Sequence, residues 1–226
     1  MSEHQHKHVM TDITDPSVFW TQEFWDERYS TSGRIWSGNP NQRLVEQVSH
    51  LTPGTALDVG CGEGGDAIWL AVQGWQVTAM DVSPVALARG AEEAAKAGPE
   101  IANRITWKHV DMLTWDLASE QFDLVSAHYI HLPSQQREVF HTRLGSAVRP
   151  GGTLLIVGHH PSDLEKGIRR PNFPDLMFTA EQIVESLPSD AWEVHYAGAP
   201  ERSWVDPEGQ TATISDAVFR ATRKAS

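Results

Sequence analysis

Short runs of apolar residues alternate with longer stretches of helical periodicity through the middle of the chain. The apolar runs predict strands at residues 55–59, 76–80, 105–110, 122–127 and 153–157. Helical patterns lie between several of them: one opens at Ser83-Pro84 and stops at Gly98-Pro99, and another spans 134–148. Strands that alternate with helices favour βαβ units with parallel strands and right-handed crossovers. The pattern therefore predicts an α/β fold.

The N-terminal part of the chain follows a different pattern. Residues 1–14 are polar and lack periodicity, which predicts a disordered arm. Two helix starts follow, at Asp15-Pro16 and at Asn39-Pro40, each a capping residue before a proline. No repeat and no second domain boundary is visible, so residues 15–226 are expected to form one domain.

The last third of the chain is less regular. Residues 159–177 show little periodicity, which predicts a long functional loop that contacts the substrate. A short helix is predicted at 180–187. The alternation in 192–196, followed by a second apolar stretch at 212–222, predicts an antiparallel hairpin at the end of the domain.

The charge balance excludes two classes of partner. The chain has 226 residues, with 18 Lys and Arg against 30 Asp and Glu, so its formal net charge is −12. Sequence-independent binding to DNA or RNA needs basic residues, and anionic membranes attract basic patches. We therefore expect a small-molecule substrate, and neither a nucleic-acid nor a membrane partner.

Cysteine usage and the polar start of the chain indicate the compartment. The only cysteine, Cys61, permits no internal disulfide and fits a reducing environment. No secretory signal is visible, and no apolar run reaches the ~18 residues of a membrane helix. These features predict a cytoplasmic protein. Its oligomeric state is left open, with a monomer as the expectation.

The densest local signal is the glycine-rich segment after the first predicted strand. Gly60, Gly62 and Gly65 have the spacing G-x-G-x-x-G between a strand and a helix, and Asp81 ends the next strand. Taken alone, this pattern fits a dinucleotide site and hence a nicotinamide-dependent oxidoreductase. A non-catalytic module that binds a cofactor is a second possibility for such a loop.

The charges around the loop argue against a pyrophosphate ligand. No Lys or Arg occurs between Arg43 and Arg89. The same stretch holds the carboxylates of Asp58, Glu63, Asp66 and Asp81. Carboxylates repel a pyrophosphate but attract an ammonium or a sulfonium. Glycines let the backbone approach such a ligand closely, and Asp81 can accept hydrogen bonds from ribose hydroxyls.

Four segments, taken in order, resemble the motifs of class I S-adenosylmethionine-dependent methyltransferases. They are Ala56 to Gly64, Met80-Asp81-Val82-Ser83, Asp111-Met112 and Arg149-Pro150-Gly151-Gly152-Thr153. The resemblance implies a Rossmann-like seven-stranded sheet, mostly parallel with one antiparallel strand, and helices on both faces. It also implies S-adenosyl-L-methionine as the cofactor and methyl transfer as the activity.

The same resemblance implies which residues bind the cofactor. For the methionine portion they are Asp58, Gly60, Cys61, Gly62 and Ala127. For the ribose and adenine they are Asp81, Val82, Asp111 and Met112. Two of these residues have a simpler alternative role. Asp111 can be a capping or surface carboxylate, and Cys61 can be a small residue in a crowded turn.

The N-terminal segment resembles that of the tellurite-resistance and thiopurine methyltransferase branch. Residues 24–29, Phe-Trp-Asp-Glu-Arg-Tyr, and then Trp36, are similar to a segment that folds over the cofactor in that branch. This resemblance makes residues 15–52 lid helices and places Tyr29 and Trp36 at the cofactor. An aromatic face there could attract a sulfonium, and packing of the N-terminal helix is the alternative.

The C-terminal end resembles that of the tellurite enzymes, which makes Arg202 a candidate substrate-binding residue. One departure matters for the acceptor. Glu201-Arg202 stands where those enzymes carry His-Arg, and Gln210 replaces a second arginine. Fewer basic groups weaken the expectation of a tellurite-like oxyanion as substrate.

Histidines and a tyrosine follow the fourth and fifth predicted strands, where open α/β sheets place reactive groups. His128 and His131 are the candidate catalytic bases, because a neutral imidazole can take a proton from a hydroxyl or an amine. Tyr129 and His159 are candidates for substrate binding. A thiol needs little such help, because it is partly ionised at neutral pH.

The sequence therefore predicts an S-adenosylmethionine-dependent methyltransferase that acts on a small, soft nucleophile such as a thiol or a metalloid. Methylation of a hydroxyl or amine metabolite with a histidine base is the alternative. No metal is expected, because the carboxylate cluster that metal-dependent catechol enzymes carry beyond strand four is not evident here.

Overall fold

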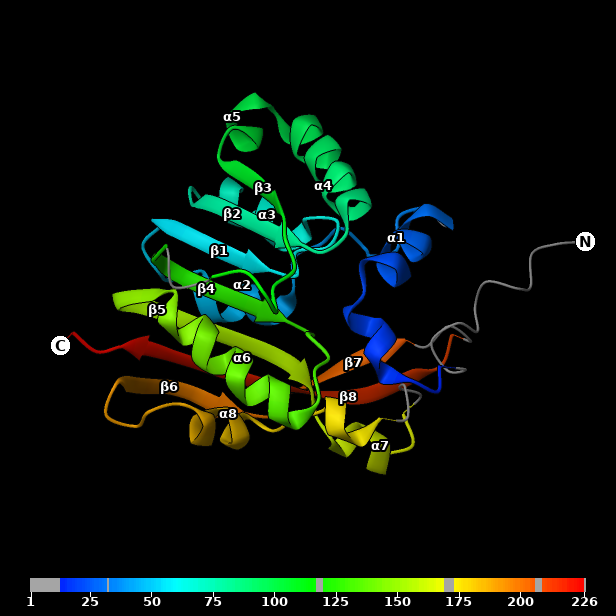
Figure 1. Cartoon of the computed structure of the whole chain (residues 1–226), viewed down its shortest axis with the longest axis vertical. Coiled ribbons are helices and arrows are strands. Elements are labelled where there is room, and N and C mark those ends of the chain that lie inside the picture. Colours follow the sequence, from blue (N-terminus) through cyan, green and yellow to red (C-terminus); the bar gives the residue numbers. More distant parts are fainter. Residues whose placement is uncertain (1–12, 32, 117–119, 169–172, 206–208, 226) are drawn as a thin grey trace, which may run out of the picture.

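The structure is a computed structural model in which one twisted sheet carries helices on both sides (Figure 1). It describes residues 13–225 apart from 32, 117–119, 169–172 and 206–208. Most of the predicted arm, residues 1–12, lies outside the described residues.

The sheet follows the predicted topology. Its strands are β1 (Thr55–Val59), β2 (Gln76–Asp81), β3 (Ile105–His109), β4 (Phe122–His128), β5 (Val148–His159), β6 (Trp192–Gly198), β7 (Glu201–Val205) and β8 (Thr211–Arg223). Their order is β3-β2-β1-β4-β5-β8-β6, and β7 pairs with β8. Strands β1 to β5 are parallel, whereas β8 runs antiparallel to β5, β6 and β7. The predicted Rossmann-like α/β fold is confirmed.

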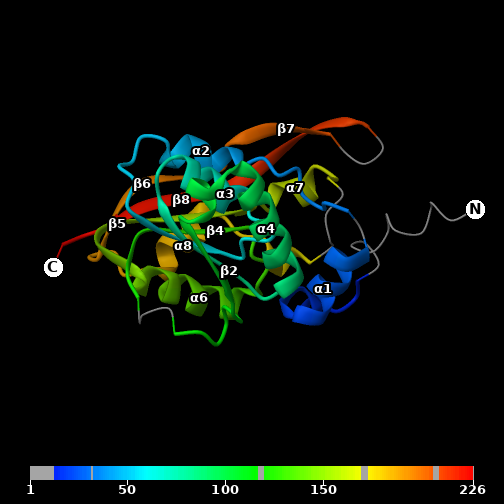
Figure 2. The same ribbon diagram turned by 90° about the horizontal axis from the view of Figure 1, so that it is seen from above.

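Helices flank the sheet on both faces. They are η1 (Pro16–Trp20), α1 (Gln22–Thr31), α2 (Gln42–Val48), α3 (Gly65–Val72), α4 (Pro84–Ala97), α5 (Pro99–Ala102), α6 (Ser134–Ser146), α7 (Ser162–Glu165), η3 (Pro174–Leu176) and α8 (Ala180–Ser186). Seen from above, α2 and α3 lie on one side of the sheet and α6 on the other (Figure 2). The layers are those of a doubly wound fold.

The apolar side chains of the central strands alternate between two cores. In β5, Leu154 and Ile156 pack in the core under α6 and α8, and Leu155 and Val157 pack in the core under α2 and α3. Because successive side chains of a strand point to opposite faces, a continuous apolar run marks a strand covered on both sides. This is why the short apolar runs were recognisable as central strands.

Element boundaries differ from the sequence prediction in three places. The signal at Asp15-Pro16 starts a short 3-10 helix, and the chain becomes extended at Thr21 before α1 begins. Strand β5 starts at Val148 and not at residue 153, because the backbone of Val148 already pairs with Phe122 of β4. The predicted loop 159–177 contains the short helices α7 and η3.

From β1 the chain adds strands first on one side, as β2 and β3, and then on the other, as β4 and β5. The strand order therefore reverses between β1 and β4. In open α/β sheets a ligand crevice forms at such a reversal, beyond the carboxyl ends of the strands. Figure 1 shows α1 beyond the arrowheads of β1 and β4. The fold therefore places the N-terminal helices over the edge of the sheet where a ligand site is expected.

The close approach between β5 and the segment before α8 gives a test of the packing. A Cβ on Gly158 would lie 2.2 Å from the Phe178 ring, whereas a Cβ on Gly33 would meet nothing within 4 Å. We expect Gly158→Ala to lower the free energy of unfolding by about 1–3 kcal/mol, because the core has no room for the methyl group. Gly33→Ala should change it by less than about 0.5 kcal/mol. Chemical denaturation measures both, and equal stability of the two variants would contradict this packing.

Candidate active site

The glycine loop turns sharply from β1 into α3. Gly60, Gly62 and Gly64 have φ of 70°, 53° and 78°, in the left-handed region that other residues rarely adopt. The N–H groups of Gly60 and Cys61 donate to the carbonyl of Met80 at 2.9 and 3.0 Å. The loop is thus held against the end of β2, as the glycine spacing predicts.

Asp81 joins the loop to the start of α4. Its carboxylate accepts hydrogen bonds from the N–H groups of Gly62, at 2.8 Å, and Ser83, at 2.9 Å. Burial raises the pKa of Asp81, although these N–H groups stabilise its charge. Val82 follows, and its carbonyl oxygen lies 3.0 Å from Nε2 of His109. The side chain of Asp81 therefore stands at the predicted position, between the glycine loop and α4.

Tyr29 and Trp36 lie directly over the glycine loop. A Cβ on Gly62 would lie 3.0 Å from the Tyr29 hydroxyl and 3.3 Å from Nε1 of Trp36. The indole N–H of Trp36 donates to that hydroxyl at 3.0 Å. Tyr29 is buried, whereas 47% of Trp36 is exposed. The structure thus brings both predicted lid residues to the loop.

Glu63 anchors this segment to the loop, a role that the sequence analysis missed. Its buried carboxylate accepts the N–H groups of Ile35 and Trp36, each at 3.0 Å, and pairs with Arg89 at 2.9 Å. A single carboxylate in a glycine loop carries no sequence signal for such partners, which lie in other segments.

Asp111 and Met112 follow β3, farther along the same edge. Asp111 is exposed, and one oxygen accepts the N–H of Leu113 at 2.8 Å, as a capping residue does. Met112 packs against the core under α6. Ala127 is buried next to Val59 of β1.

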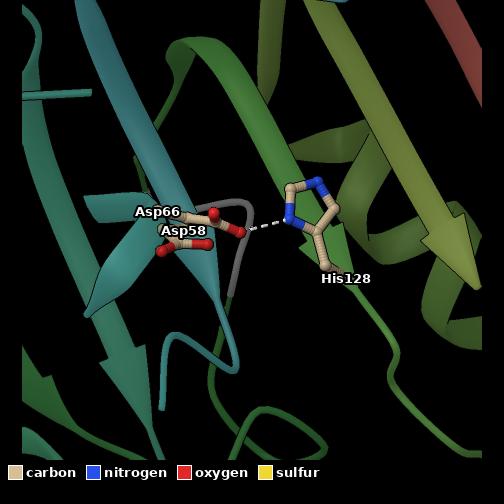
Figure 3. Close-up of side chains that lie close together, drawn as sticks. All are labelled: Asp58, Asp66 and His128. Atoms are coloured by element: carbon tan, nitrogen blue, oxygen red, sulfur yellow. Dashed lines mark hydrogen bonds and ion pairs between the residues drawn. The ribbon is translucent and has the colours of Figure 1, made fainter. Parts of the chain in front are cut away.

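Three ionisable side chains meet where β1, α3 and β4 come together (Figure 3). Nδ1 of His128 lies 2.6 Å from Oδ2 of Asp66, and Asp58 lies beside them. Burial, followed by the charge of Asp66, raises the pKa of Asp58 to about 7. Burial lowers the pKa of His128, but the hydrogen bond and charge of Asp66 and the charge of Asp58 outweigh it and raise that pKa.

The same three groups offer one ligand atom each within 4.8 Å of one another, which is close enough to consider a metal ion. A separation of 2.6 Å between Nδ1 and Oδ2 is that of a shared proton. Two ligands bound to one ion at ~2.0–2.1 Å in tetrahedral geometry lie farther apart than this. The geometry therefore supports a hydrogen-bonded pair of Asp66 and His128.

A group of rings forms beyond the ends of β4 and β5. The ring of His159 lies 4.7 Å from that of Tyr129 and 5.3 Å from that of His131, and His131 lies 6.0 Å from Phe19. The indole N–H of Trp20 donates to the carbonyl of His131. The structure therefore joins His131, Tyr129 and His159, whereas His128 turns to Asp66 and does not share their cluster.

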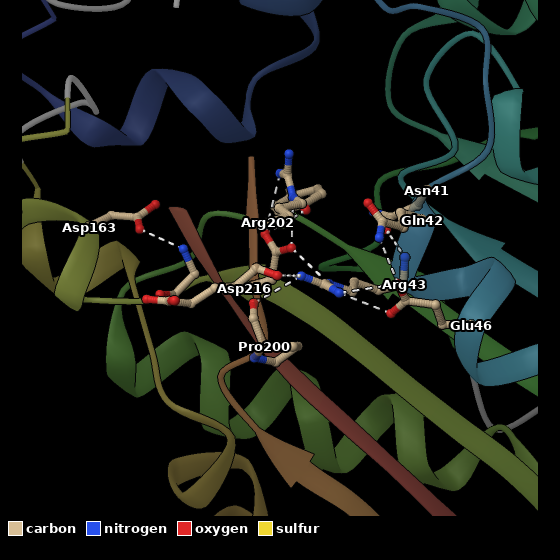
Figure 4. A network of polar contacts seen from close by, with 11 residues as sticks. Asn41, Gln42, Arg43, Glu46, Asp163, Pro200, Arg202 and Asp216 are labelled. Atoms are coloured by element: carbon tan, nitrogen blue, oxygen red, sulfur yellow. Dashed lines mark hydrogen bonds and ion pairs between the residues drawn. The ribbon is translucent and has the colours of Figure 1, made fainter. Parts of the chain in front are cut away.

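Tyr129 has an unusual backbone conformation and contacts a buried polar network that is centred on Asp216 (Figure 4). It has φ of 54°, the only positive value among the described residues other than glycine. Its hydroxyl donates to Oδ1 of Asp216 at 3.0 Å. Burial and the charge of Asp216 raise the pKa of Tyr129 to about 12. A strained residue at the end of a central strand is typical of a functional site.

Two arginines neutralise Asp216, which has no exposed surface. Nε of Arg43 and Nε of Arg202 approach Oδ2 at 3.0 and 2.8 Å. Arg202 also donates to the Tyr129 hydroxyl at 3.3 Å. Arg202 was predicted to bind substrate, and in the structure its guanidinium is used to hold Asp216 and Tyr129. Arg43 and Asp216 were not found by sequence reasoning, although an aspartate within an apolar strand is a signal of a buried ion pair.

The buried pairing of Asp216 should contribute strongly to stability. Asp216→Ala removes the buried carboxylate that Arg43 and Arg202 share and leaves Arg43 only the more exposed Glu46, so we expect the free energy of unfolding to fall by about 3–5 kcal/mol. Glu46, the more exposed partner of Arg43, is the matched control. Glu46→Ala should cost less than about 1 kcal/mol. Similar losses for the two variants, measured by chemical denaturation, would show that the network is not the anchor described here.

No helix within the described residues combines the length and apolar character needed to cross a membrane.

Comparisons with known proteins agree with this geometry. Residues 56–152 match the family described as "Methyltransferase domain". An uncharacterized methyltransferase of Mycobacterium tuberculosis is 34% identical over 135 residues, which cover 59% of this chain and 65% of the relative. The chain thus matches less than two thirds of the length of that curated relative.

Two solved structures share the fold. One is a protein described under "Conversion of a Disulfide Bond into a Thioacetal Group during Echinomycin Biosynthesis". It is 23% identical to this chain with a TM-score of 0.70, and the match covers 90% of this chain and 91% of that one. The other is TehB from Haemophilus influenzae, which is 19% identical with a TM-score of 0.65. The match covers 90% of this chain and 67% of TehB. Similarity at this level shows the fold and leaves the branch open. Over residues 56–152 the chain is therefore similar to methyltransferase domains, on a fold that solved methyltransferases share.

Proposed function

We propose that this protein transfers the methyl group of S-adenosylmethionine to a small soft nucleophile, a thiol or a metalloid. The observation that carries this choice of acceptor is the wall of rings beyond β4 and β5, formed by Phe19, Tyr129, His131 and His159. Polarisable rings suit a large, weakly hydrated nucleophile better than a charged oxyanion.

The glycine loop and its carboxylates support the cofactor assignment. Oδ2 of Asp58 is buried and has no hydrogen-bond partner among the described residues. A buried carboxylate oxygen without a donor favours a cationic ligand such as an ammonium. Gly60 and Gly62 let the backbone of the loop pack closely against its neighbours, because a Cβ on Gly60 would lie 2.5 Å from Ile130 and one on Gly62 would lie 3.0 Å from the Tyr29 hydroxyl. These residues fit the methionine portion of S-adenosylmethionine.

The remaining cofactor contacts are proposed from position. Asp81 would hold the ribose hydroxyls, Val82 and Met112 would border the adenine, and Asp111 would accept from its amino group. Ala127 would line the methionine portion. Tyr29 and Trp36, which cover Gly62, would close the site from above. This closure resembles the lid proposed for residues 15–52.

In this arrangement the chain contributes alignment and exclusion of water. The bound cofactor supplies an activated methyl group on a positively charged sulfur. Tyr29, Trp36 and the ring wall keep water away, and the loop orients the methyl toward the acceptor. A dry site favours this reaction, because the positive charge disperses in the transition state.

The paired arginines also support a soft acceptor. Arg43 pairs with Asp216 and Glu46, and Arg202 pairs with Asp216, so two carboxylates balance the charges of the two guanidinium groups. An oxyanion acceptor would need a basic side chain whose charge is not already balanced by a carboxylate. The thioacetal-forming relative, whose reaction involves sulfur, is consistent with this reading.

A second candidate is methylation of a hydroxyl or an amine with histidine assistance. The observation that favours it is the hydrogen bond between Asp66 and His128, since an oriented imidazole is typical of a general base.

The cofactor assignment can be tested at Asp81. We expect Asp81→Ala to weaken binding of S-adenosylhomocysteine by about 1.5–3 kcal/mol, because charge-assisted hydrogen bonds are lost. Calorimetric titration measures the effect, and thermal unfolding checks that the fold persists. Glu92→Ala, which removes an exposed carboxylate of α4, is the control and should bind normally. Unchanged affinity of a folded Asp81→Ala protein would refute the site.

The acceptor class can be tested by turnover. Purified protein is incubated with S-adenosylmethionine and one of several acceptors (thiols, selenite, tellurite, phenols or amines), and released S-adenosylhomocysteine is measured. We expect turnover with thiols or metalloids at least tenfold above that with phenols and amines, because a hydroxyl or an amine is not activated by a wall of rings. Preference for a phenol or an amine would support the second candidate instead.

A further inference from the structure

The contact between Asp66 and His128 is fixed by a further hydrogen bond of Asp66, which distinguishes it from a chance surface contact. Asp66 lies in the first turn of α3, and its Oδ2 is 2.6 Å from Nδ1 of His128. Its other oxygen accepts the backbone N–H of Asn41 at 2.5 Å. Because both carboxylate oxygens are engaged, Asp66 cannot rotate freely, and it holds the imidazole with the proton on Nδ1.

The second imidazole nitrogen is left for a ligand. Nε2 of His128 is buried and has no hydrogen-bond partner within the described part of the chain. Figure 3 shows it on the side of the ring away from Asp58 and Asp66. With the proton on Nδ1, Nε2 presents a lone pair and can accept a proton. Buried polar atoms in folded proteins rarely lack a partner unless they have a functional use.

The position of His128 in the sheet places this residue at the expected ligand crevice. His128 is the last residue of β4 and is paired with Val157 of β5, one residue after the pairing of Ala127 with Val59. It therefore stands next to Gly60 and the glycine loop, at the reversal of strand order.

Another buried histidine of the protein shows the contrast. Burial together with the charge of Arg137 lowers the pKa of His141 of α6 to about 3, and no carboxylate of the described residues offsets this. It is a neutral packing residue, with its ring against Phe178. The charged groups that face His128 are Asp66 of α3 and Asp58 of β1, which both favour a proton on the ring. His128 is thus equipped to receive a proton, and His141 is not.

We propose that Asp66 positions His128 so that Nε2 removes the proton of the acceptor, and that the acceptor is consequently a thiol and not a metalloid anion. This inference rests on the proposed function. The sulfhydryl proton passes to Nε2 as the sulfur lone pair forms the bond to the methyl carbon. The bond between that carbon and the cofactor sulfur breaks, and its electron pair stays on the cofactor sulfur. Asp66 stabilises the imidazolium until its proton is released to water. Asp66 is a positioning residue, and His128 is the catalytic residue.

The size of the effect follows from thiol ionisation. A thiol with the ordinary pKa of about 8.5 is about 3% ionised at pH 7, so a base can raise the reactive fraction at most ~30-fold. The gain grows tenfold for each further unit of thiol pKa and vanishes for a thiol that is already ionised. A base for a hydroxyl or an amine would instead contribute ~10²–10⁴-fold.

The test uses two thiols of similar shape and different acidity. Benzenethiol is largely ionised at neutral pH, and phenylmethanethiol is largely protonated. Turnover of each by the full chain with S-adenosylmethionine is measured from pH 6.5 to 10 as S-adenosylhomocysteine released, with sodium tellurite as a probe that has no sulfhydryl proton. The variants are Asp66→Asn and His128→Gln, and His195→Gln, an exposed histidine of β6, is the control.

At pH 7 both variants should lose about 10- to 100-fold in kcat/KM for phenylmethanethiol and less than about threefold for benzenethiol, and tellurite should give no turnover with any of the proteins. The loss for phenylmethanethiol should shrink as the pH approaches the pKa of that thiol. His195→Gln should match the unchanged protein at every pH. Affinity for S-adenosylhomocysteine should stay within about twofold in all variants, which separates a role in chemistry from one in cofactor binding or folding.

The contrary outcomes are distinct. Equal losses for both thiols, a loss that does not depend on pH, or a parallel loss of S-adenosylhomocysteine affinity would overturn the role of the pair and leave the proposed function standing. Turnover of tellurite alone would overturn the choice of a thiol. Binding of S-adenosylhomocysteine without turnover of any thiol or metalloid would overturn the proposed acceptor and this inference together. If Asp66→Asn does not fold, His128→Gln decides the question, because it retains a polar side chain beside Asp66.

Discussion

The carboxylates that gather where β1 and β2 end have to be stabilised without a lysine or arginine from residues 44–88. Backbone N–H groups provide most of that stabilisation. Asp81 takes two from Gly62 and Ser83, and Asp66 takes one from Asn41. Asp58 is the exception, since burial leaves its pKa near 7. The loop, the lid and α2 are all positioned by this need to surround negative charge with donors.

The same constraint divides the site into two halves of different character. The cofactor half is acidic and is built from loops and helix starts around Asp58 and Asp81. The acceptor half is lined by rings, and its two arginines are balanced by Asp216 and Glu46. His128 lies where the two halves meet, held by Asp66 of the cofactor half, whereas His131, only three positions later, lies among the rings of the acceptor half. The turn at Tyr129, with its positive φ, is what sends the two side chains to different surroundings.

Hydrophobic periodicity and glycine spacing were sufficient to predict the fold and the position of the loop. Both depend on local sequence: a buried strand is a short apolar run, and a left-handed turn needs glycine. The polar partners were beyond the reach of this reasoning. Asp66 and His128 are 62 positions apart, and Arg43 and Asp216 are 173 apart. Periodicity tells which face of an element is buried, but not which distant side chain meets it. The roles assigned to Asp111, Met112 and Ala127 stay predictions for the same reason.

The start of α2 connects the two halves of the site. Asn41 donates its N–H to Asp66 on the cofactor side, and Arg43, two residues later, binds Asp216 on the acceptor side. A shift of this short helix therefore disturbs both at once. A seven-residue helix that contacts neither reactant in this scheme thus sets the positions of a carboxylate in each half.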